Sequence, residues 1–117
     1  MSALILTGAA DTLALLSQLV RDNGMEPICC STTADALSHL RSQPSVILVF
    51  ICALGTSPAD ACWPVLAEIP SGAPLFSIIF SRTASGNPRL RLDGFAAGAR
   101  MVTDRPEGVG TYCLMQN

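Results

Sequence analysis

The chain has 117 residues, half of them apolar and only 14% charged. This length suits a single domain spanning residues 1–117, and such a composition excludes a disordered chain. The net charge of −2, with seven basic residues that are all arginine, argues against nucleic-acid binding. The longest apolar run, residues 46–54, is too short to cross a membrane, and no basic residues precede the N-terminal apolar stretch. We therefore predict a cytoplasmic protein without membrane contact.

Five cysteines, with no pair at CxxC spacing, occur at positions 29, 30, 52, 62 and 113. Reduced thiols that act as small buried hydrophobes explain them best, and this fits a reducing compartment. Cys29 and Cys30 are adjacent, so on a strand they point to opposite faces. One histidine and scattered cysteines do not form a zinc ligand set, and we predict no metal and no cofactor.

The first quarter of the chain predicts a strand, a helix and a second strand. Residues 3–6 form a short apolar strand, and Asp11 is a suitable N-cap for a helix whose leucines recur at helical spacing. Gly24 is available for a left-handed helix end. Residues 27–30 follow as the second strand.

The middle of the chain predicts a helix, a central strand and a third helix. Any of residues 31–33 can cap the second helix, which stops before Pro44. Residues 46–52 are apolar throughout, which is typical of a strand buried on both faces. Ser57 with its following proline favours the start of the third helix, and Pro64 is expected to bend or shorten that helix.

The last third predicts two more strands and two helices. Residues 75–80 form the fourth strand, and Pro88 opens a fourth helix that Gly98 closes. This helix is expected to carry the apolar residues Leu90, Leu92, Phe95 and Ala96. Residues 100–103 form the fifth strand. A last, short helix is expected from Glu107, with two glycines weakening its first turns.

Strands that alternate with helices predict a parallel sheet with helices on both faces, because each crossover is right-handed. In such a sheet, ligands bind beyond the carboxyl ends of the strands. Thr7 and Gly8 resemble the opening of the glycine motif of short-chain dehydrogenases, but Thr12 and Ala14 stand where its later glycines belong. The single histidine, His39, lies on the second predicted helix, away from that rim. We therefore predict that the chain is not an enzyme.

Three segments resemble the receiver domains of bacterial response regulators, the CheY-like family. Residues 98–106, which read GARMVTDRP, resemble the Gly-Ala…Lys-Pro stretch of that family. Residues 44–49 resemble the run into the phosphoacceptor strand, and residues 3–6 followed by Asp11 resemble the opening. The resemblance covers nearly the whole chain. It implies a flavodoxin-like, doubly wound five-stranded parallel sheet of order 2-1-3-4-5 with helices on both faces.

The departures from the family pattern remove the chemistry of phosphorylation. In receivers, two acidic residues after the first strand hold Mg²⁺, and an aspartate at the end of the third strand accepts the phosphoryl group. The matching positions are Thr7, Gly8 and Phe50, whereas Ser81 keeps a hydroxyl and Arg105 replaces a lysine. A phenyl ring cannot carry an acyl phosphate, and Mg²⁺ needs carboxylate oxygens. The resemblance therefore implies a degenerate pseudo-receiver without Mg²⁺, in which Phe50 fills the emptied pocket.

Receivers commonly meet partners through the fourth helix, the fifth strand and the last helix, and the resemblance implies that face here. Its candidate residues are Arg89, Arg91, Arg100, Val102, Val109 and Tyr112. A short last helix is expected to leave an apolar patch uncovered, which usually marks an interface. We predict a phosphorylation-independent module for protein interaction or homodimerisation in signalling. The alternative is a small-molecule or anion sensor, in which the vacated pocket near Arg105 holds a ligand.

Overall fold

The computed structural model describes residues 2–7, 10–42, 47–54, 63–69, 75–81, 86 and 88–116. The strands are β1 (Ser2–Leu6), β2 (Glu26–Cys30), β3 (Ile47–Leu54), β4 (Phe76–Ser81) and β5 (Met101–Thr103). The helices are α1 (Ala10–Asp22), α2 (Thr33–Ser42), α3 (Trp63–Glu68), α4 (Pro88–Ala96) and α5 (Pro106–Gln116). Within the described residues, no helix has the length and apolar character needed to span a bilayer.

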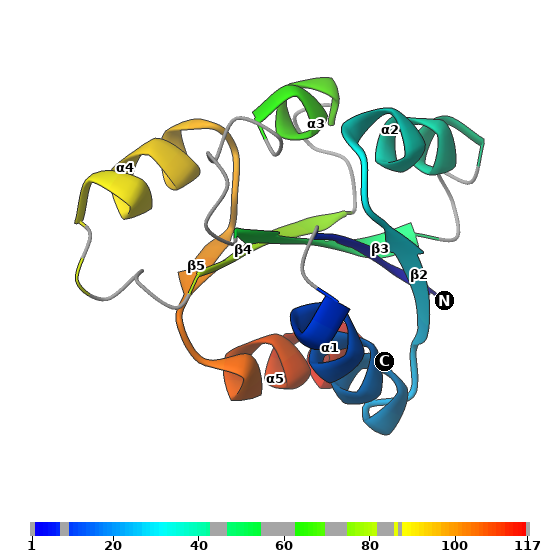
Figure 1. The fold of residues 1–117 in the computed structure, drawn as a ribbon. Helices are drawn as coiled ribbons and strands as arrows, with labels where there is room; N and C mark the ends of the chain where they lie inside the picture. The colour runs from blue at the N-terminus through cyan, green and yellow to red at the C-terminus, as the bar shows by residue number, and fades with distance from the viewer. Residues whose placement is uncertain are drawn as a thin grey trace.

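The five strands form one parallel sheet in the order β2-β1-β3-β4-β5. Helices α2, α3 and α4 cover one face of the sheet, and α1 and α5 cover the other (Figure 1). The predicted flavodoxin-like, doubly wound architecture of order 2-1-3-4-5 is thus confirmed. The apolar strand β3 lies at the centre, because a strand covered by helices on both faces has no solvent-facing side to fill with polar residues.

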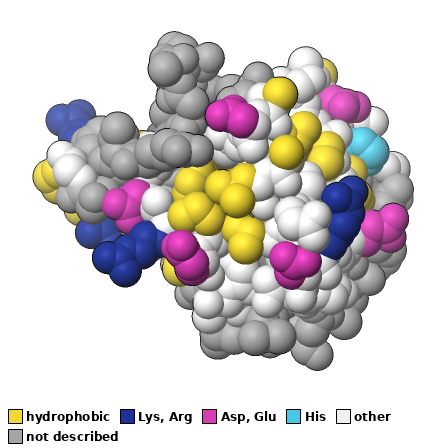
Figure 2. All heavy atoms as spheres, turned by 60° about the horizontal axis from the view of Figure 1, so that its bottom comes forward, with side chains coloured by type: hydrophobic (Ala, Val, Ile, Leu, Met, Phe, Trp, Pro, Cys, Tyr) yellow, Lys and Arg dark blue, Asp and Glu magenta, His cyan; other side chains and the backbone are white. Residues whose placement is uncertain are grey.

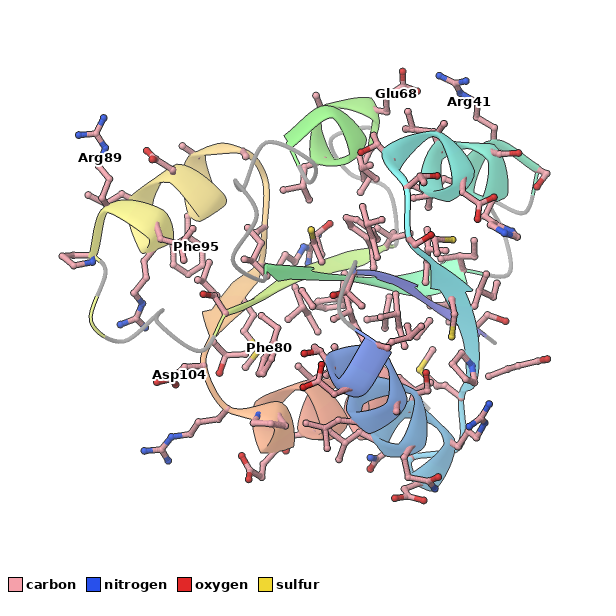
Figure 3. The ribbon with its side chains drawn as sticks, viewed as in Figure 1. Arg41, Glu68, Phe80, Arg89, Phe95 and Asp104 are labelled. Atoms are coloured by element: carbon pink, nitrogen blue, oxygen red, sulfur yellow. The ribbon has the colours of Figure 1, made fainter. Side chains whose placement is uncertain are left out.

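Successive side chains of β3 belong alternately to two hydrophobic clusters, one on each face of the sheet. Phe50 and Cys52 lie in the cluster beneath α2, α3 and α4. Val49 and Ile51 lie in the cluster that α1 and α5 cover, together with Phe80 of β4, which points toward those helices in Figure 3. This alternation lets β3 contribute side chains to both halves of the core.

Several predicted helix boundaries are confirmed by their local geometry. Gly24 after α1 and Gly98 after α4 have φ angles of 85° and 107°, a left-handed conformation that glycine adopts without strain. Thr32 caps α2, since its Oγ1 accepts the backbone N–H of Asp35 at 3.2 Å.

Two helix starts differ from the predictions. The helix α1 begins at Ala10, so Asp11 lies in its first turn, where a negative charge still favours the helix dipole. The helix α3 begins at Trp63, so Pro64 also lies in a first turn, where its missing N–H breaks no helical hydrogen bond. The predicted start at Ser57 lies outside the described residues.

The helix α4 turns Gly94 toward the sheet and leaves two of its large apolar side chains exposed. Gly94 is buried, and a Cβ built on it would lie 2.9 Å from both Ile79 Cδ1 and Val102 Cγ2. Leu92 and Phe95, two of the apolar residues expected on this helix, are 69% and 48% exposed. The absence of a side chain at Gly94 lets this side of the helix approach the sheet closely, and that approach sets the rotation of the helix.

The last helix forms despite its two glycines and packs against the rest of the protein. It extends over 11 residues and lies against α1 (Figure 1). Its glycines permit close packing on two sides: a Cβ on Gly110 would lie 3.0 Å from Nδ2 of Asn23, just after α1, and one on Gly108 would lie 3.2 Å from Cε of Met101 in β5. Val109, between them, is fully buried. The expectation that a short last helix leaves the sheet uncovered is therefore wrong.

The three cysteines whose side chains the structure describes are of two kinds. Cys29 and Cys30 are free thiols on opposite sides of β2, as predicted: Cys29 Sγ lies 3.3 Å from Ser17 Oγ of α1, and Cys30 lies in the cluster beneath α2. Cys52 is disulfide-bonded. The prediction of reduced thiols is wrong at Cys52, and the inferred reducing compartment loses that support.

Candidate functional site

The carboxyl edge of the sheet is the place where the predicted pocket should lie. Thr7 follows β1, and its backbone N–H donates to the carbonyl oxygen of Cys30 at 3.1 Å. Ser81 ends β4 opposite Leu54 of β3. The structure places Thr7 and Ser81 at this edge, each with only 5% exposure. Gly8 lies outside the described residues.

Phe50 does not lie at the carboxyl edge. It pairs with Leu4 on one side and Ser77 on the other, it is fully buried, and β3 continues beyond it to Leu54. The prediction that Phe50 fills the pocket is therefore wrong, because a uniformly apolar run does not mark where its strand ends. None of residues 50–54 is acidic, so a shift along this strand restores no carboxylate.

The segment after β5 carries charged side chains. Arg105 is exposed, and its backbone N–H donates to Thr103 Oγ1 at 3.1 Å. Asp104 is half-buried and lies just past the end of β5 in Figure 3. The guanidinium of Arg105 is thus directed to solvent at the end of the sheet, where it can meet an anion without the cost of burying a charge.

The predicted interaction face is only partly a surface. Its exposed members are Arg89, Arg91 and Arg100. Val102 is 5% exposed and Val109 is fully buried, so placing these two side chains on a surface is wrong. Val102 lies in the cluster beneath α4, and Val109 lies in the cluster on the opposite face of the sheet. The side chain of Tyr112 lies outside the described residues.

Two large apolar side chains on α4 are exposed to solvent. Leu92 and Phe95 are 69% and 48% exposed, and Phe95 extends from α4 on the side of the β5 edge in Figure 3. The positions of the apolar residues in the sequence do not predict this exposure, because the residue that faces the sheet is Gly94 and not a larger apolar residue. We define the α4 surface as Arg89, Arg91, Leu92, Phe95 and Arg100.

In the sequence, two arginines of the α4 surface precede its apolar residues, Leu92 and Phe95, and Arg100 follows them. Arg89 points away from the body of the protein in Figure 3, with its Nε 3.6 Å from a carboxylate oxygen of Asp93. The guanidinium carbon of Arg100 lies 4.7 Å from the ring centroid of Phe76, a cation–π contact that orients an exposed side chain. Arginine side chains gather on the same margin of the molecule in Figure 2, where Figure 1 shows α4 and β5.

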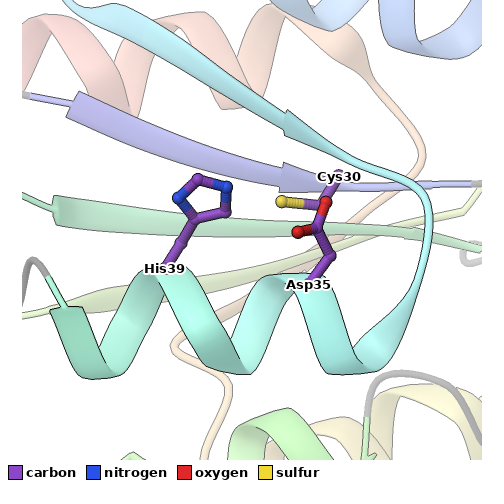
Figure 4. Close-up of side chains that lie close together, drawn as sticks. All are labelled: Cys30, Asp35 and His39. Atoms are coloured by element: carbon purple, nitrogen blue, oxygen red, sulfur yellow. The ribbon is translucent and has the colours of Figure 1, made fainter.

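A second constellation lies between the end of β2 and α2. The ligand atoms of Cys30, Asp35 and His39 all lie within 4.8 Å of one another. Figure 4 shows the thiol, the carboxylate and the imidazole converging on the space between the helix and the sheet. CxxC spacing does not mark this group, whereas the i, i+4 spacing of Asp35 and His39 places both side chains on one helix face.

This constellation contains the residue types of a Cys-His-Asp catalytic set, but its chemistry is unfavourable for a nucleophile. Desolvation raises the pKa of the Cys30 thiol from 9.0 to about 11, and the nearby charge of Asp35 and a hydrogen bond to it act in the same direction. The thiolate is the nucleophilic form, and this site disfavours it. Cys30 is also only 2% exposed. The geometry therefore supports a binding site better than a covalent catalyst.

Known structures provide a comparison for the whole fold. No protein-family model matches the sequence, and no curated protein matches it. A response-regulator receiver domain from Clostridium thermocellum matches with a TM-score of 0.75 and 16% identity, over 98% of this chain and 94% of that chain. The chemotaxis response regulator CheY4 of Vibrio cholerae matches with a TM-score of 0.71 and 16% identity, over 98% and 96%. This chain has the receiver-domain fold.

A third receiver structure is described as a dimer. The beryllofluoride-activated NtrC4 receiver domain dimer matches with a TM-score of 0.71 and 11% identity, over 98% of this chain and 97% of that chain. At such low identity the likeness establishes the receiver fold, and function has to be argued from the side chains of this chain.

Proposed function

We propose that this receiver-fold chain is a phosphorylation-independent pseudo-receiver that acts in signalling by binding protein through the α4 surface. The observation that carries this proposal is the exposure of Leu92 and Phe95 between arginines. Aromatic and arginine side chains are enriched at the energetic centres of protein interfaces. Gly94 anchors the helix on the sheet, so the two apolar side chains are presented from a fixed support. On this proposal the chain is a binding module and not an enzyme.

The composition of the carboxyl edge supports independence from phosphorylation. Thr7 and Gly8 occupy the positions at which receivers carry acidic Mg²⁺ ligands, and residues 50–54 supply no aspartate to accept a phosphoryl group. Hydroxyl and apolar groups cannot replace the carboxylate oxygens that Mg²⁺ requires. We therefore propose that no Mg²⁺ binds there. A cytoplasmic location stays a prediction.

A second copy of this chain is the occupant that we propose for the α4 surface. Arg89 and Asp93 lie on the same helix, and their mutual contact is long and exposed, so it is weak. A two-fold axis through the surface would let each arginine meet the aspartate of the other copy, while Leu92 and Phe95 pack at the centre. The NtrC4 receiver structure, which has this fold, is a dimer, and this supports pairing as the mode of binding.

Replacing Leu92 with glutamate is expected to weaken homodimerisation at least about tenfold, because it places a charge at the desolvated centre of the interface. Sedimentation velocity over a concentration series measures the dissociation constant. The free energy of unfolding should change by less than about 0.5 kcal/mol, since this side chain is 69% exposed. Leu15→Glu is the matched control, because Leu15 is a 38% exposed leucine on α1, on the opposite face of the sheet.

Two results would contradict this assignment. A wild-type protein that stays monomeric up to millimolar concentration would exclude a second copy as the occupant. Equal weakening by Leu15→Glu and Leu92→Glu would exclude the α4 surface as the interface.

Addition of Mg²⁺ with beryllofluoride, a mimic of the phosphoryl group, is expected to leave the amide NMR resonances of Thr7, Ser81 and β5 unchanged. The physical reason is the missing carboxylates at the carboxyl edge. Coordinated shifts at that edge and at β5 would instead indicate a working phosphorylation switch. The alternative of an anion sensor is distinguished by inorganic phosphate without Mg²⁺: shifts centred on Thr7, Ser81 and Arg105 would favour the sensor.

A further inference from the structure

The side chains of Cys30, Asp35 and His39 offer one sulfur, one oxygen and one nitrogen ligand to a common point. All three ligand atoms lie within 4.8 Å of one another. Zinc bonds such atoms at about 2.0–2.3 Å, which places tetrahedral ligand atoms roughly 3.3–3.8 Å apart. Side-chain rotations that bring the groups closer by about 1 Å are therefore sufficient to enclose an ion.

The backbone holds these three residues in place from both sides. Cys30 ends β2, and its carbonyl oxygen accepts the N–H of Thr7 at 3.1 Å. Thr32 then caps α2 through the backbone N–H of Asp35. Asp35 and His39, one helical turn apart, project from the same side of that helix toward Cys30 (Figure 4). A site on two regular elements is held more precisely than one on loops.

The surroundings of the three ligands suit a metal ion. Cys30 is buried, His39 is half-buried and Asp35 is exposed, so the site extends from the core to the solvent. An ion can enter from the open side, and water can complete the coordination there. A thiolate and a carboxylate together balance the charge of a divalent ion, and the ion itself supplies the positive charge that deprotonates a thiol which stays protonated in its absence. Sulfur and imidazole ligands favour zinc over magnesium or calcium.

The simpler explanation is a hydrogen bond from the Cys30 thiol to Asp35, with His39 nearby as a consequence of helical spacing. That hydrogen bond makes no use of the imidazole, whereas a metal site uses all three groups. The two explanations differ in what they predict for His39, and this difference can be measured.

We propose that Cys30, Asp35 and His39 form a Zn²⁺ site that ties the edge strand β2 to α2. The site goes beyond the proposed protein-binding role, since α2 and α4 lie at opposite ends of the same helix layer (Figure 1). β2 is an edge strand, with β1 on one side and no further strand in the sheet beyond it. A metal that binds only the folded chain stabilises this edge by mass action.

Titration of the metal-free protein with Co²⁺ tests the proposal directly. We expect a near-ultraviolet sulfur-to-cobalt charge-transfer band together with visible bands of tetrahedral cobalt, and we expect Zn²⁺ to displace them. Zn²⁺ at a hundred-fold excess over its dissociation constant should raise the Tm by about 10 °C. The absence of both the cobalt bands and the Zn²⁺-dependent rise in Tm would overturn the proposal.

Variants distinguish this site from binding elsewhere. Asp35→Asn and His39→Asn, at exposed and half-buried positions, are expected to fold and to weaken Zn²⁺ binding at least about tenfold. Cys30→Ser should remove the charge-transfer band. Cys29→Ser is the matched control, since this adjacent thiol faces α1 and should not affect binding. Loss of the band in Cys29→Ser but not in Cys30→Ser, or unchanged Zn²⁺ affinity in His39→Asn, would overturn the assignment.

Discussion

Replacing Phe50 with aspartate is expected to unfold the protein rather than to create a phosphorylation site. Phe50 is fully buried at the centre of the sheet, between Leu4 of β1 and Ser77 of β4. Loss of a buried phenyl group costs about 3–5 kcal/mol, and a buried carboxyl group without hydrogen-bond partners adds to that cost. The sum is comparable to the whole free energy of unfolding of a small domain, about 5–15 kcal/mol.

Circular dichroism and urea unfolding measure this outcome. Phe50→Ala, with an expected loss of about 3–5 kcal/mol, supplies a measurable value if the aspartate variant does not fold. Phe95→Asp is the matched control: Phe95 is 48% exposed, and the change should be less than about 1 kcal/mol. A folded Phe50→Asp variant that accepts a phosphoryl group from acetyl phosphate would show that Phe50 lies at the carboxyl edge.

Replacing Gly94 with valine is expected to lower the free energy of unfolding by about 1–3 kcal/mol. A Cβ at this position would already lie 2.9 Å from Ile79 Cδ1 and from Val102 Cγ2, and the two further methyl groups of valine have no space between α4 and the sheet. The intrinsic helix preference of valine over glycine, at most about 0.5 kcal/mol, offsets only part of this strain. Urea unfolding monitored by circular dichroism gives the difference.

The matched control is Ala96→Val, which adds the same side chain at an exposed position of the same helix. Its cost should stay below about 0.7 kcal/mol, the difference in helix propensity. If both valine variants are equally stable, then α4 does not lie as close to the sheet as described. Such a result would also remove the rigid support that the proposed role of Leu92 and Phe95 requires.

The prediction that the carboxyl edge lacks acidic Mg²⁺ ligands rests on residue identity alone. The resemblance to receivers matches Thr7 and Gly8 to the two acidic positions and Arg105 to the lysine. The position of Phe50 was not predictable. The run from residue 46 to residue 54 is apolar throughout, so no polar side chain marks the place where the strand leaves the core.

Local patterns were sufficient for the order of strands and helices and for several helix ends. Gly24, Gly98 and Thr32 act within a few residues of their own position, through backbone conformation and capping hydrogen bonds. Alternation of strand and helix then restricts the topology, because crossovers in a parallel sheet are right-handed. These features depend on interactions between residues that are close together in the sequence. Such interactions can be inferred from the sequence alone.

The exposed side of α4 and the cluster around His39 became visible only in three dimensions. The side of a helix that faces the core depends on how closely a distant sheet lets it approach, and Gly94 meets Ile79 and Val102 only in the folded chain. The sulfur of Cys30 likewise meets the imidazole of His39 because α2 folds back over the end of β2. Residues that are far apart in the sequence come into contact only when the chain has folded. Their spacing along the sequence does not say how far apart they lie in the folded protein.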